Sequence, residues 1–418
     1  MPTPPPIVLF DDGLGLLSPL TDLRASFEVR TGALTAIERL GHTAGARIAA
    51  WACPPSLQPL VGERIGVPPL GDLRSDDPLL LVNGRCPLLP AAALALARGQ
   101  ALVEERSGHI IAANASLRHA AAVVRSDPAG LTMTKHPGHT LIARPWDIRA
   151  FRDACIAHDL AVLAAARRYP SSQSNLHVAP SARVHPSAIF DTETGAILID
   201  EHATIRPGAI LVGPAYIGPN STVLERTLIK ANTTIGPWCK VAGEIGGTIF
   251  QGFANKAHDG HLGDSWIGEW ANLGAGTTNS NLLNTYGEVI ARPLGTPTLR
   301  GGSGQPGTPI LRGGSADDQK LAALSNERTG QQFLGATIGD HVKTAICTRI
   351  MTGVVVGTGT MFAASGPLTG TVPPLSWITD SGTKTFAIEK FIDVAKAAMA
   401  RRKIVPSEAY LARLRSLA

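Results

Sequence analysis

The chain has 418 residues, more than one hydrophobic core usually organises, and this length favours two domains. Its formal net charge of +5 is spread along the sequence without a basic stripe interleaved with aromatic residues, which argues against a nucleic-acid partner. No stretch reaches the roughly 20 apolar residues of a membrane span, so a soluble protein with no membrane partner is expected.

The five cysteines lie far apart and include no C-x-x-C pair. An odd number of scattered thiols indicates neither a disulfide framework nor a thiolate zinc site. The N-terminus has no basic region ahead of its short apolar run, Ile7 to Phe10, so no signal peptide is expected. These features predict a cytoplasmic protein with reduced, mostly buried thiols.

The first domain is expected over residues 1–169, where short apolar runs alternate with amphipathic stretches. Ile7 to Phe10 and Leu79 to Val82 have the composition of buried strands, and Thr35 to Leu40 and Pro145 to Arg168 have the pattern of helices. This alternation predicts an α/β domain. The stretch that follows is rich in Ser and Asn and is the expected linker, Pro170 to Asn175.

A second domain is expected over residues 176–378, where aliphatic side chains return at every sixth position. The longest run is Ile199, Ile205, Leu211, Ile217, Val223, Ile229, Ile235 and Val241, and a later run is Ile338, Thr344, Ile350, Val356 and Phe362. Each six residues would form a short strand and a turn, three such units would form one coil of a triangular prism, and every sixth side chain would point into its core. This pattern predicts a parallel β-helix, and known folds with this signature wind left-handed.

Glycine recurs directly after the inward-pointing residue of the repeat. The positions are Gly218, Gly236, Gly268, Gly274, Gly339 and Gly357. Because glycine tolerates positive φ, we interpret these residues as the places where the chain turns.

Two interruptions and a tail complete the predicted organisation. The repeat breaks at Gly246 to Asp264, which we interpret as a functional loop that leaves the scaffold. A Gly- and Pro-rich stretch, 291–320, cannot bury a core and predicts a flexible insertion. Residues 384–418 form the tail, in which Thr385 to Arg402 has the pattern of an amphipathic helix.

One long block carries the chemistry. It runs from Phe253 to Asn281 and reads FANKAHDGHLGDSWIGEWANLGAGTTNSN. This block resembles the acetyltransferase half of the bifunctional N-acetylglucosamine-1-phosphate uridyltransferase and glucosamine-1-phosphate acetyltransferase family, in a divergent bacterial branch. The resemblance implies a homotrimer that takes acetyl-CoA as co-substrate and a sugar phosphate as acceptor.

The shared L-G-D and N-x-G-A-G-T segments place individual residues on the family's functional positions. His258 falls on the catalytic histidine, and Asn272 and Asn281 fall on asparagines that contact the sugar phosphate. His261 stands where the family has a tyrosine, and Lys256 lies in the same block, so both are assigned to substrate binding.

Two further departures concern the acceptor sugar. Leu282 replaces another tyrosine of the family, and Gly287 replaces a lysine that contacts substrate. They leave the identity of the sugar open and do not alter the expected reaction.

The residue types fit the reaction that the resemblance implies. An amino sugar arrives as an ammonium, so a base with a pKa near 7, such as His258, must take a proton before the nitrogen attacks the thioester. The resulting oxyanion needs fixed N–H donors, which the turn Gly274, Ala275 and Gly276 can supply as the acetyl-CoA-binding segment.

Some trimeric β-helices bind zinc through three histidines, which is an alternative use of these side chains. Here His258 and His261 are three residues apart and His341 is remote in sequence, so no metal site is expected.

The first half of the chain has a weaker resemblance to the nucleotidyltransferase half of the same family, carried by VLFDD, SPLTDLR, FEVRTGALTAIERL and LLLVNGRCPLL. An active domain of this kind would bind a nucleoside triphosphate and Mg²⁺. Arg85 stands where the family supplies the metal-binding aspartate, and a cation there would repel Mg²⁺. The candidate nucleotide or sugar-phosphate ligands are Asp11, Asp12, Arg24, Glu28 and Arg30, and a salt-bridged turn is the alternative reading of the same residues.

The sequence thus predicts an acetyltransferase of amino sugar phosphates whose first domain adds a sugar-1-phosphate nucleotidyltransferase activity. Two alternatives stay open. In the first, the chain is a sugar-1-phosphate nucleotidyltransferase whose β-helix only assembles the oligomer. In the second, it is a non-catalytic sugar-nucleotide-binding protein.

Overall fold

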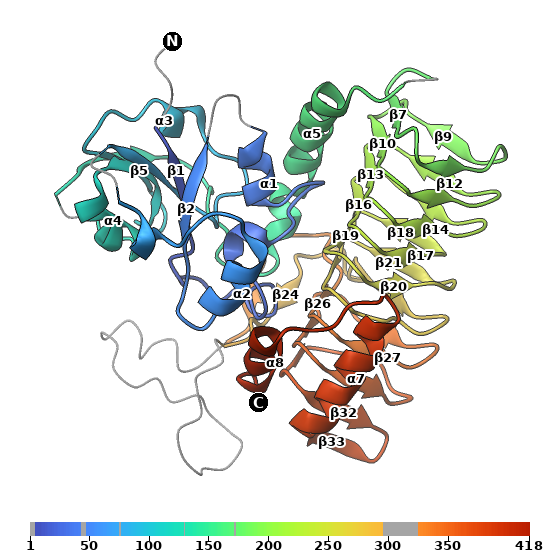
Figure 1. The fold of residues 1–418 in the computed structure, drawn as a ribbon. Helices are drawn as coiled ribbons and strands as arrows, with labels where there is room; N and C mark the ends of the chain where they lie inside the picture. Colours follow the sequence, from blue (N-terminus) through green and yellow to red (C-terminus); the bar gives the residue numbers. More distant parts are fainter. Residues whose placement is uncertain (1–4, 43–46, 75–76, 129, 171–172, 296–324) are drawn as a thin grey trace. The chain divides into compact units, whose positions relative to one another are not determined.

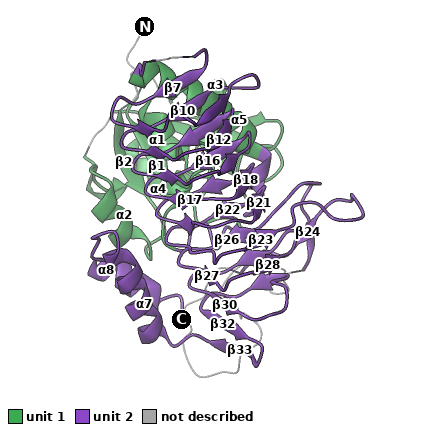
Figure 2. Cartoon of the chain, turned by 90° about the vertical axis from the view of Figure 1, so that its right-hand side faces the viewer, with its two compact units in different colours: residues 1–15, 23–143, 151–167 green, residues 16–22, 144–150, 168–418 purple. Residues whose placement is uncertain are grey.

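The computed structural model describes residues 5–42, 47–74, 77–128, 130–170, 173–295 and 325–418. The chain forms two compact units, coloured separately in Figure 2. Unit 1 comprises residues 1–15, 23–143 and 151–167, and unit 2 comprises residues 16–22, 144–150 and 168–418. The insertion expected at 291–320 falls mostly on residues outside the described part, as do two residues of the expected linker.

Unit 1 is built on a six-stranded mixed sheet with the strand order β2-β1-β3-β5-β4-β6. Its strands are β1 Ile7–Phe10, β2 Ile48–Ala52, β3 Leu79–Asn83, β4 Gln100–Glu104, β5 Ile110–Ala115 and β6 Thr132–His136. Its helices are η1 Ser26–Glu28, α1 Ala36–Gly41, α2 Gln58–Arg64, η2 Leu70–Asp72, α3 Ala91–Leu94, α4 Leu117–Val124 and most of α5 Asp147–Arg167. The predicted α/β architecture is confirmed, with the four predicted elements in place.

Unit 2 is a parallel β-helix in which strands of successive coils pair in register (Figure 1). The first face has nine strands, β7 Leu176–Val178, β10 Ile197–Ile199, β13 Ala215–Ile217, β16 Thr233–Ile235, β19 Ile249–Phe250, β22 Trp266–Ile267, β26 Thr337–Ile338, β29 Val355–Val356 and β31 Thr371–Val372. The predicted β-helix is confirmed, and its left hand stays a prediction.

The second and third faces carry the outward side chains that concern function. The second face comprises β8 Arg183–Val184, β11 Thr204–Ile205, β14 Thr222–Val223, β17 Lys240–Val241, β20 Asn255–Lys256, β27 Lys343–Thr344, β30 Met361–Ala363, β32 Ser376–Thr379 and the antiparallel β33 Gly382–Thr385. The third face comprises β9 Ile189–Asp191, β12 Ile210–Val212, β15 Leu228–Ile229, β18 Glu244–Gly246, β21 His261–Gly263, and a further pair, β23 Thr278–Asn279 with β28 Arg349–Ile350. Beside the coils, β24 Ile290–Ala291 and β25 Glu327–Arg328 form an antiparallel pair.

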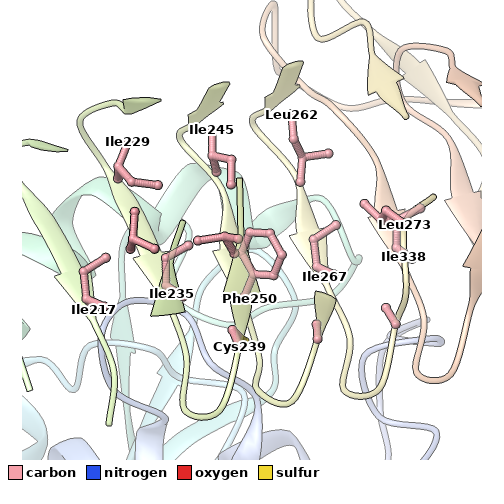
Figure 3. Close-up of a cluster of buried hydrophobic side chains, with 14 of the residues drawn as sticks. Ile217, Ile229, Ile235, Cys239, Ile245, Phe250, Leu262, Ile267, Leu273 and Ile338 are labelled. Carbon is pink, nitrogen blue, oxygen red and sulfur yellow. The ribbon is translucent and has the colours of Figure 1, made fainter. Parts of the chain in front are cut away.

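The inward side chains form one continuous apolar column along the helix axis, part of which Figure 3 shows. All eight residues of the longest predicted run are buried in this core, and Ile338, Ile350, Val356 and Phe362 of the later run join it. Burial of these side chains in a narrow space explains why most inward positions of the repeat carry aliphatic residues, with Phe250 and Phe362 as larger members of the same core.

The structure requires glycine at these positions of the repeat for a different reason from the one expected. A Cβ on Gly218 would lie 2.9 Å from the backbone of Gly236, and a Cβ on Gly236 would lie 2.4 Å from the oxygen of Phe250. Positive φ occurs two residues further on, for example at Asn220 (60°) and Trp238 (59°). The glycines therefore allow one coil to approach the next, and the prediction that they mark the positive-φ turn was wrong.

The segment Gly246 to Asp264 does not leave the scaffold. Its strands β19, β20 and β21 pair with the strands of the preceding coil, so the predicted loop is wrong. The period of six fails here because the inward positions lie closer together, four residues apart from Val241 to Ile245 and five from Ile245 to Phe250. Lys256 also takes an inward position, in register with Val241.

The tail forms two helices, α7 Ile388–Ala400 and α8 Glu408–Arg415. The predicted helix is confirmed but starts three residues later than expected, because Gly382–Thr385 pairs with β32 as strand β33.

Candidate functional site

Two turns of the β-helix lie one above the other where the second face meets the third. We call residues 257–260 the His258 corner and residues 274–277 the glycine corner. They belong to successive coils, since a Cβ on Gly260 would lie 2.2 Å from the oxygen of Thr277. The structure thus places His258 beside the predicted acetyl-CoA segment, Gly274 to Gly276, although 16 residues separate His258 from Gly274 in the sequence.

The imidazole of His258 is exposed at its corner. Within the part of the chain that the structure describes, no hydrogen bond or ion pair involves this side chain. Its ring nitrogens are therefore accessible to a ligand that enters from solvent.

Lys256 lies at the base of the same corner and points into the core, with 1% of its surface exposed. Its Nζ donates hydrogen bonds to the carbonyl oxygens of Ala242 (3.2 Å), His258 (2.9 Å) and Asp259 (2.9 Å). Burial lowers the pKa of Lys256 to about 8. The side chain predicted to bind substrate instead fixes the backbone of the His258 corner from below.

The glycine corner presents backbone donors. Gly274 N–H donates to the hydroxyl of Thr344, and Ala275 oxygen accepts from Cys347 N–H at 2.6 Å. The N–H groups of Ala275 and Gly276 have no acceptor among the described residues. Contacts with the next coil hold these two amide donors in place. They can therefore stabilise an oxyanion without a rearrangement of the backbone.

His261 and Asn281 come together on the third face above Gly263. The Nε2 atom of His261 and the Nδ2 atom of Asn281 each lie 2.7 Å from the position that a Cβ on Gly263 would occupy. The absence of a side chain at Gly263 therefore creates the space in which these two predicted substrate contacts meet.

Three charged residues surround this pair and were missed by the sequence reasoning. Glu244 Oε1 lies 3.4 Å from His261 Nδ1, and Asp264 Oδ2 accepts a hydrogen bond from Asn281 Nδ2 at 2.7 Å. Arg149 Nε lies 2.9 Å from Asp264 Oδ1. A hydrogen bond from Lys230, ahead of the charge of His261, lowers the pKa of Glu244. Glu244 pairs with His261 across one coil, a relation that becomes visible only once the coil length is known.

Asn272 lies on the second face, away from the His261 and Asn281 pair. Its backbone pairs in parallel with Asn255 on the preceding coil and with Lys343 on the following coil. The predicted substrate-binding residues therefore flank the two corners from both sides.

In unit 1, two of the predicted ligands are occupied by other protein groups. Asp12 forms a bidentate ion pair with Arg85, in which Nε lies 2.8 Å from Oδ1 and Nη2 lies 2.6 Å from Oδ2. Asp12 also accepts a hydrogen bond from Asn83. Burial would raise the pKa of Asp12, but the hydrogen bonds and charge of Arg85 outweigh burial and hold it below its ordinary value. Asp11 accepts hydrogen bonds from the N–H groups of Gly13 and Ser26, and burial raises its pKa.

Two of the other three candidates of unit 1 form ion pairs with protein groups, as in the salt-bridged alternative, and the third, Arg24, is buried. Glu28 accepts from Ala25 N–H and lies 3.5 Å from Arg64, and Arg30 lies 3.3 Å from Glu38. Arg24 is 1% exposed. None of the five predicted ligands lines the cavity of about 600 Å³ that lies between Trp51–Cys53, Leu70–Arg74 and α4, which sequence reasoning missed.

No group of three or more His, Cys, Asp or Glu side chains among the described residues could hold a metal ion. His341 is buried, and its Nε2 lies 2.7 Å from the hydroxyl of Tyr410. None of the helices described is long and apolar enough to span a membrane.

The architecture combines an α/β domain with a parallel β-helix that follows it in the chain. Residues 7–168 match the family model described as sugar nucleotidyl transferase. The chain is 30% identical over 169 residues to the bifunctional sugar-1-phosphate nucleotidylyltransferase/acetyltransferase of Sulfurisphaera tokodaii, a match that covers 39% of this chain and 34% of that protein. It is 28% identical over 155 residues to the bifunctional protein GlmU of Methanococcus vannielii, covering 37% of this chain and 28% of the relative.

Residues 7–168 thus match a sugar nucleotidyl transferase model, and part of the chain is similar to bifunctional GlmU-like proteins, which confirms the predicted resemblance. The matches span about a third of the length of these curated relatives.

Solved structures of similar fold include the UDP-N-acetylglucosamine acyltransferase of Francisella novicida, at 15% identity and a TM-score of 0.20, covering 56% of this chain and 74% of that one. Another is PerB of Caulobacter crescentus, solved with CoA and GDP-perosamine, at 12% identity and a TM-score of 0.16, covering 69% of this chain and 97% of that one. At these TM-scores neither likeness supports an inference about the site.

Proposed function

We propose that unit 2 transfers an acetyl group from acetyl-CoA to the amine of an amino sugar phosphate, with His258 as general base. The observation that carries this proposal is the stacking of the His258 corner on the glycine corner. It sets an accessible imidazole next to the amide donors of Ala275 and Gly276. A base and an oxyanion donor at neighbouring positions are the two elements that acyl transfer to an amine requires.

In this mechanism His258 accepts a proton from the amine as its nitrogen attacks the thioester carbonyl. The C–N bond forms, the negative charge that develops on the carbonyl oxygen is stabilised by the N–H groups of the glycine corner, and the thiolate departs as the C–S bond breaks. Asn281 and His261 orient the sugar from the third face, and Asn272 orients it from the second. The same N–H groups fit the carbonyl of acetyl-CoA because the described residues leave them without acceptors.

Substitution of His258 by Ala tests the proposal. A general base contributes about 10²–10⁴-fold to rate, so acetyl transfer by H258A should fall by at least 100-fold. Thermal stability should stay within about 0.5 kcal/mol of wild type because the side chain is exposed. Unchanged turnover of an amino sugar 1-phosphate panel by H258A would end the proposal.

The family match of residues 7–168 favours nucleotidyl transfer as a second candidate function, in unit 1. The carboxylates of Asp11 and Asp12 do not fit a Mg²⁺ site, since Arg85 neutralises one and backbone N–H groups surround the other. We therefore derive no metal-dependent step there. Pyrophosphate release from nucleoside triphosphate, Mg²⁺ and sugar 1-phosphate, retained in H258A, would support this activity. Binding of a sugar nucleotide without turnover would support the non-catalytic alternative.

A further inference from the structure

A row of polar side chains projects from the second face next to the corners. The residues are in register on four successive coils, namely Lys240, Asn255, Asn272 and Lys343. Side chains in register on neighbouring strands lie about 4.8 Å apart, so consecutive members of this row can contact one ligand group together.

Lys343 is mostly buried, and its ammonium group has no hydrogen bond or ion pair with any residue that the structure describes. Burial, and then the charge of nearby Arg401, lower its pKa to about 8. Removing an ammonium from water without a counter-charge is costly, and a second cation beside it adds repulsion. Lys343 thus lacks the anion that such a position requires.

The C-terminal end of α7 brings two more cations to this row. Arg401 is the residue at the helix end, and Arg402 NH2 donates to the Oδ1 atom of Asn255 at 3.1 Å. A favourable interaction with the helix dipole accounts for arginines at such an end. It does not account for Lys343, which belongs to a coil of the β-helix and lies near the charge of Arg401.

We propose that Lys343, Arg401 and Arg402, with the carboxamide of Asn272, form a binding site for a phosphate-type oxyanion. Three cations supply the charge, and the Asn255 contact holds one guanidinium over the row. Arginine and lysine donors around a partly dry site are the arrangement that binds phosphate most strongly. The presence of the site does not depend on His258, whereas the identity of the phosphate carrier rests on the proposed function.

Two sources offer this chemistry next to the corners, the phosphate of the acceptor sugar and the phosphates of coenzyme A. Calorimetric titration of the full-length protein with inorganic phosphate, glucosamine 1-phosphate, coenzyme A and 3′-dephospho-coenzyme A distinguishes them. We expect K343M to weaken the phosphate-bearing ligand that uses the site by at least tenfold. The matched control K240M, an exposed lysine of the same row, should bind as wild type does.

If K343M weakens the sugar phosphate, the site serves the acceptor; if it weakens coenzyme A more than the dephospho form, the site holds the 3′-phosphate. In phosphate-free buffer K343M should melt higher than wild type, and phosphate should raise the Tm of wild type only.

R402Q, a substitution beyond the end of α7, repeats the binding test without altering a coil of the β-helix. Wild-type affinity for all four probes in both K343M and R402Q, or equal weakening in K240M, would overturn the proposal. Because H258A should retain phosphate binding, failure of the acetyl-transfer proposal is a separate result.

Discussion

Lys256 lies at a position that the six-residue repeat reserves for an aliphatic side chain, in register with Val241. Its burial is tolerable because three carbonyl oxygens surround the ammonium group. Two of those oxygens belong to the His258 corner itself, so the lysine acts on the proposed base through the backbone.

Substitution of Lys256 by Met keeps the side-chain volume and removes the donors. Buried carbonyls left unsatisfied cost about 1–3 kcal/mol, so K256M should lower the free energy of unfolding by that amount. If the lysine positions His258, kcat should also fall about tenfold, and amide hydrogens at 257–260 should exchange faster. K240M, which removes an exposed lysine of the second face, serves as the control. Normal kcat together with normal exchange in K256M would contradict the positioning role.

Unit 1 also contains buried charges that depend on their partners, namely the ion pair of Asp12 and Arg85. Removal of one partner from a buried ion pair strands the other charge and costs about 3–5 kcal/mol. R85M should therefore destabilise unit 1 by about that much in urea denaturation. The double variant D12N/R85M, which leaves no charge, should be closer to wild type, and equal losses in both variants would refute the explanation.

The same pair gives a pH dependence with a defined sign. The pKa of Asp12 is lower in the folded state than its ordinary 3.8, so the unfolded state binds the proton more readily. The stability that the pair contributes is present above pH 3.8 and is lost as the pH falls through the lower folded value. The difference in unfolding free energy between wild type and D12N/R85M should shrink over that window. A difference that grows with acidification would be inconsistent with the pair.

At the scale of an element, the two corners are separated only by backbone. Gly260 has φ of 108°, and a Cβ there would lie 2.2 Å from Thr277 oxygen. G260A must push the glycine corner away from the His258 corner. We expect it to cost more than about 2 kcal/mol and to abolish acetyl transfer. Gly370 also has positive φ (66°) but open space around it, so G370A should cost only about 1 kcal/mol and keep full activity. Similar behaviour of the two variants would show that close approach is unimportant.

The elements show what the sequence could and could not predict. The run from Ile199 to Val241 predicted the β-helix because every inward residue enters the same narrow core. Segment Gly246 to Asp264 was wrongly predicted as a loop. Shortened sides of the coil and the inward Lys256 interrupt the six-residue spacing of aliphatic side chains there. The glycines of the repeat were assigned to the wrong cause, since close approach of two backbones involves residues of another coil and leaves no trace in local spacing.

For the site, the resemblance proposed His258, Asn281 and the glycine corner, which the structure places on neighbouring coils. It missed Glu244 and Asp264, whose contacts join residues 17 positions apart. It also assigned Lys256 to the ligand, because a motif shows which residue recurs and not on which side of the backbone its side chain lies.

At the scale of the whole molecule, the third face carries apolar side chains outward at its first coils. Ile189 and Ile210 are adjacent in register and are 56% and 37% exposed. We interpret these two neighbouring side chains as part of a surface that another protein covers. The homotrimer expected from the resemblance offers a second copy for this role.

Light scattering after size exclusion should therefore give a mass of about three times 43.6 kDa. I210K should shift this mass toward the single chain at micromolar concentration. I290K, at an exposed isoleucine of β24, should leave it unchanged. A monomeric wild type, or equal dissociation in I290K, would contradict this assignment of the surface.

The stacked corners have a consequence for how such an enzyme can change its specificity. The separation between the backbones of His258 and Ala275 is set by the rise of one coil, about 4.8 Å. The backbone therefore fixes the spacing of the two corners, whereas His261 and Asn281 project from the adjoining face. A new acceptor sugar can therefore be accommodated by substitutions of side chains on that face, while the spacing between the His258 corner and the glycine corner stays the same.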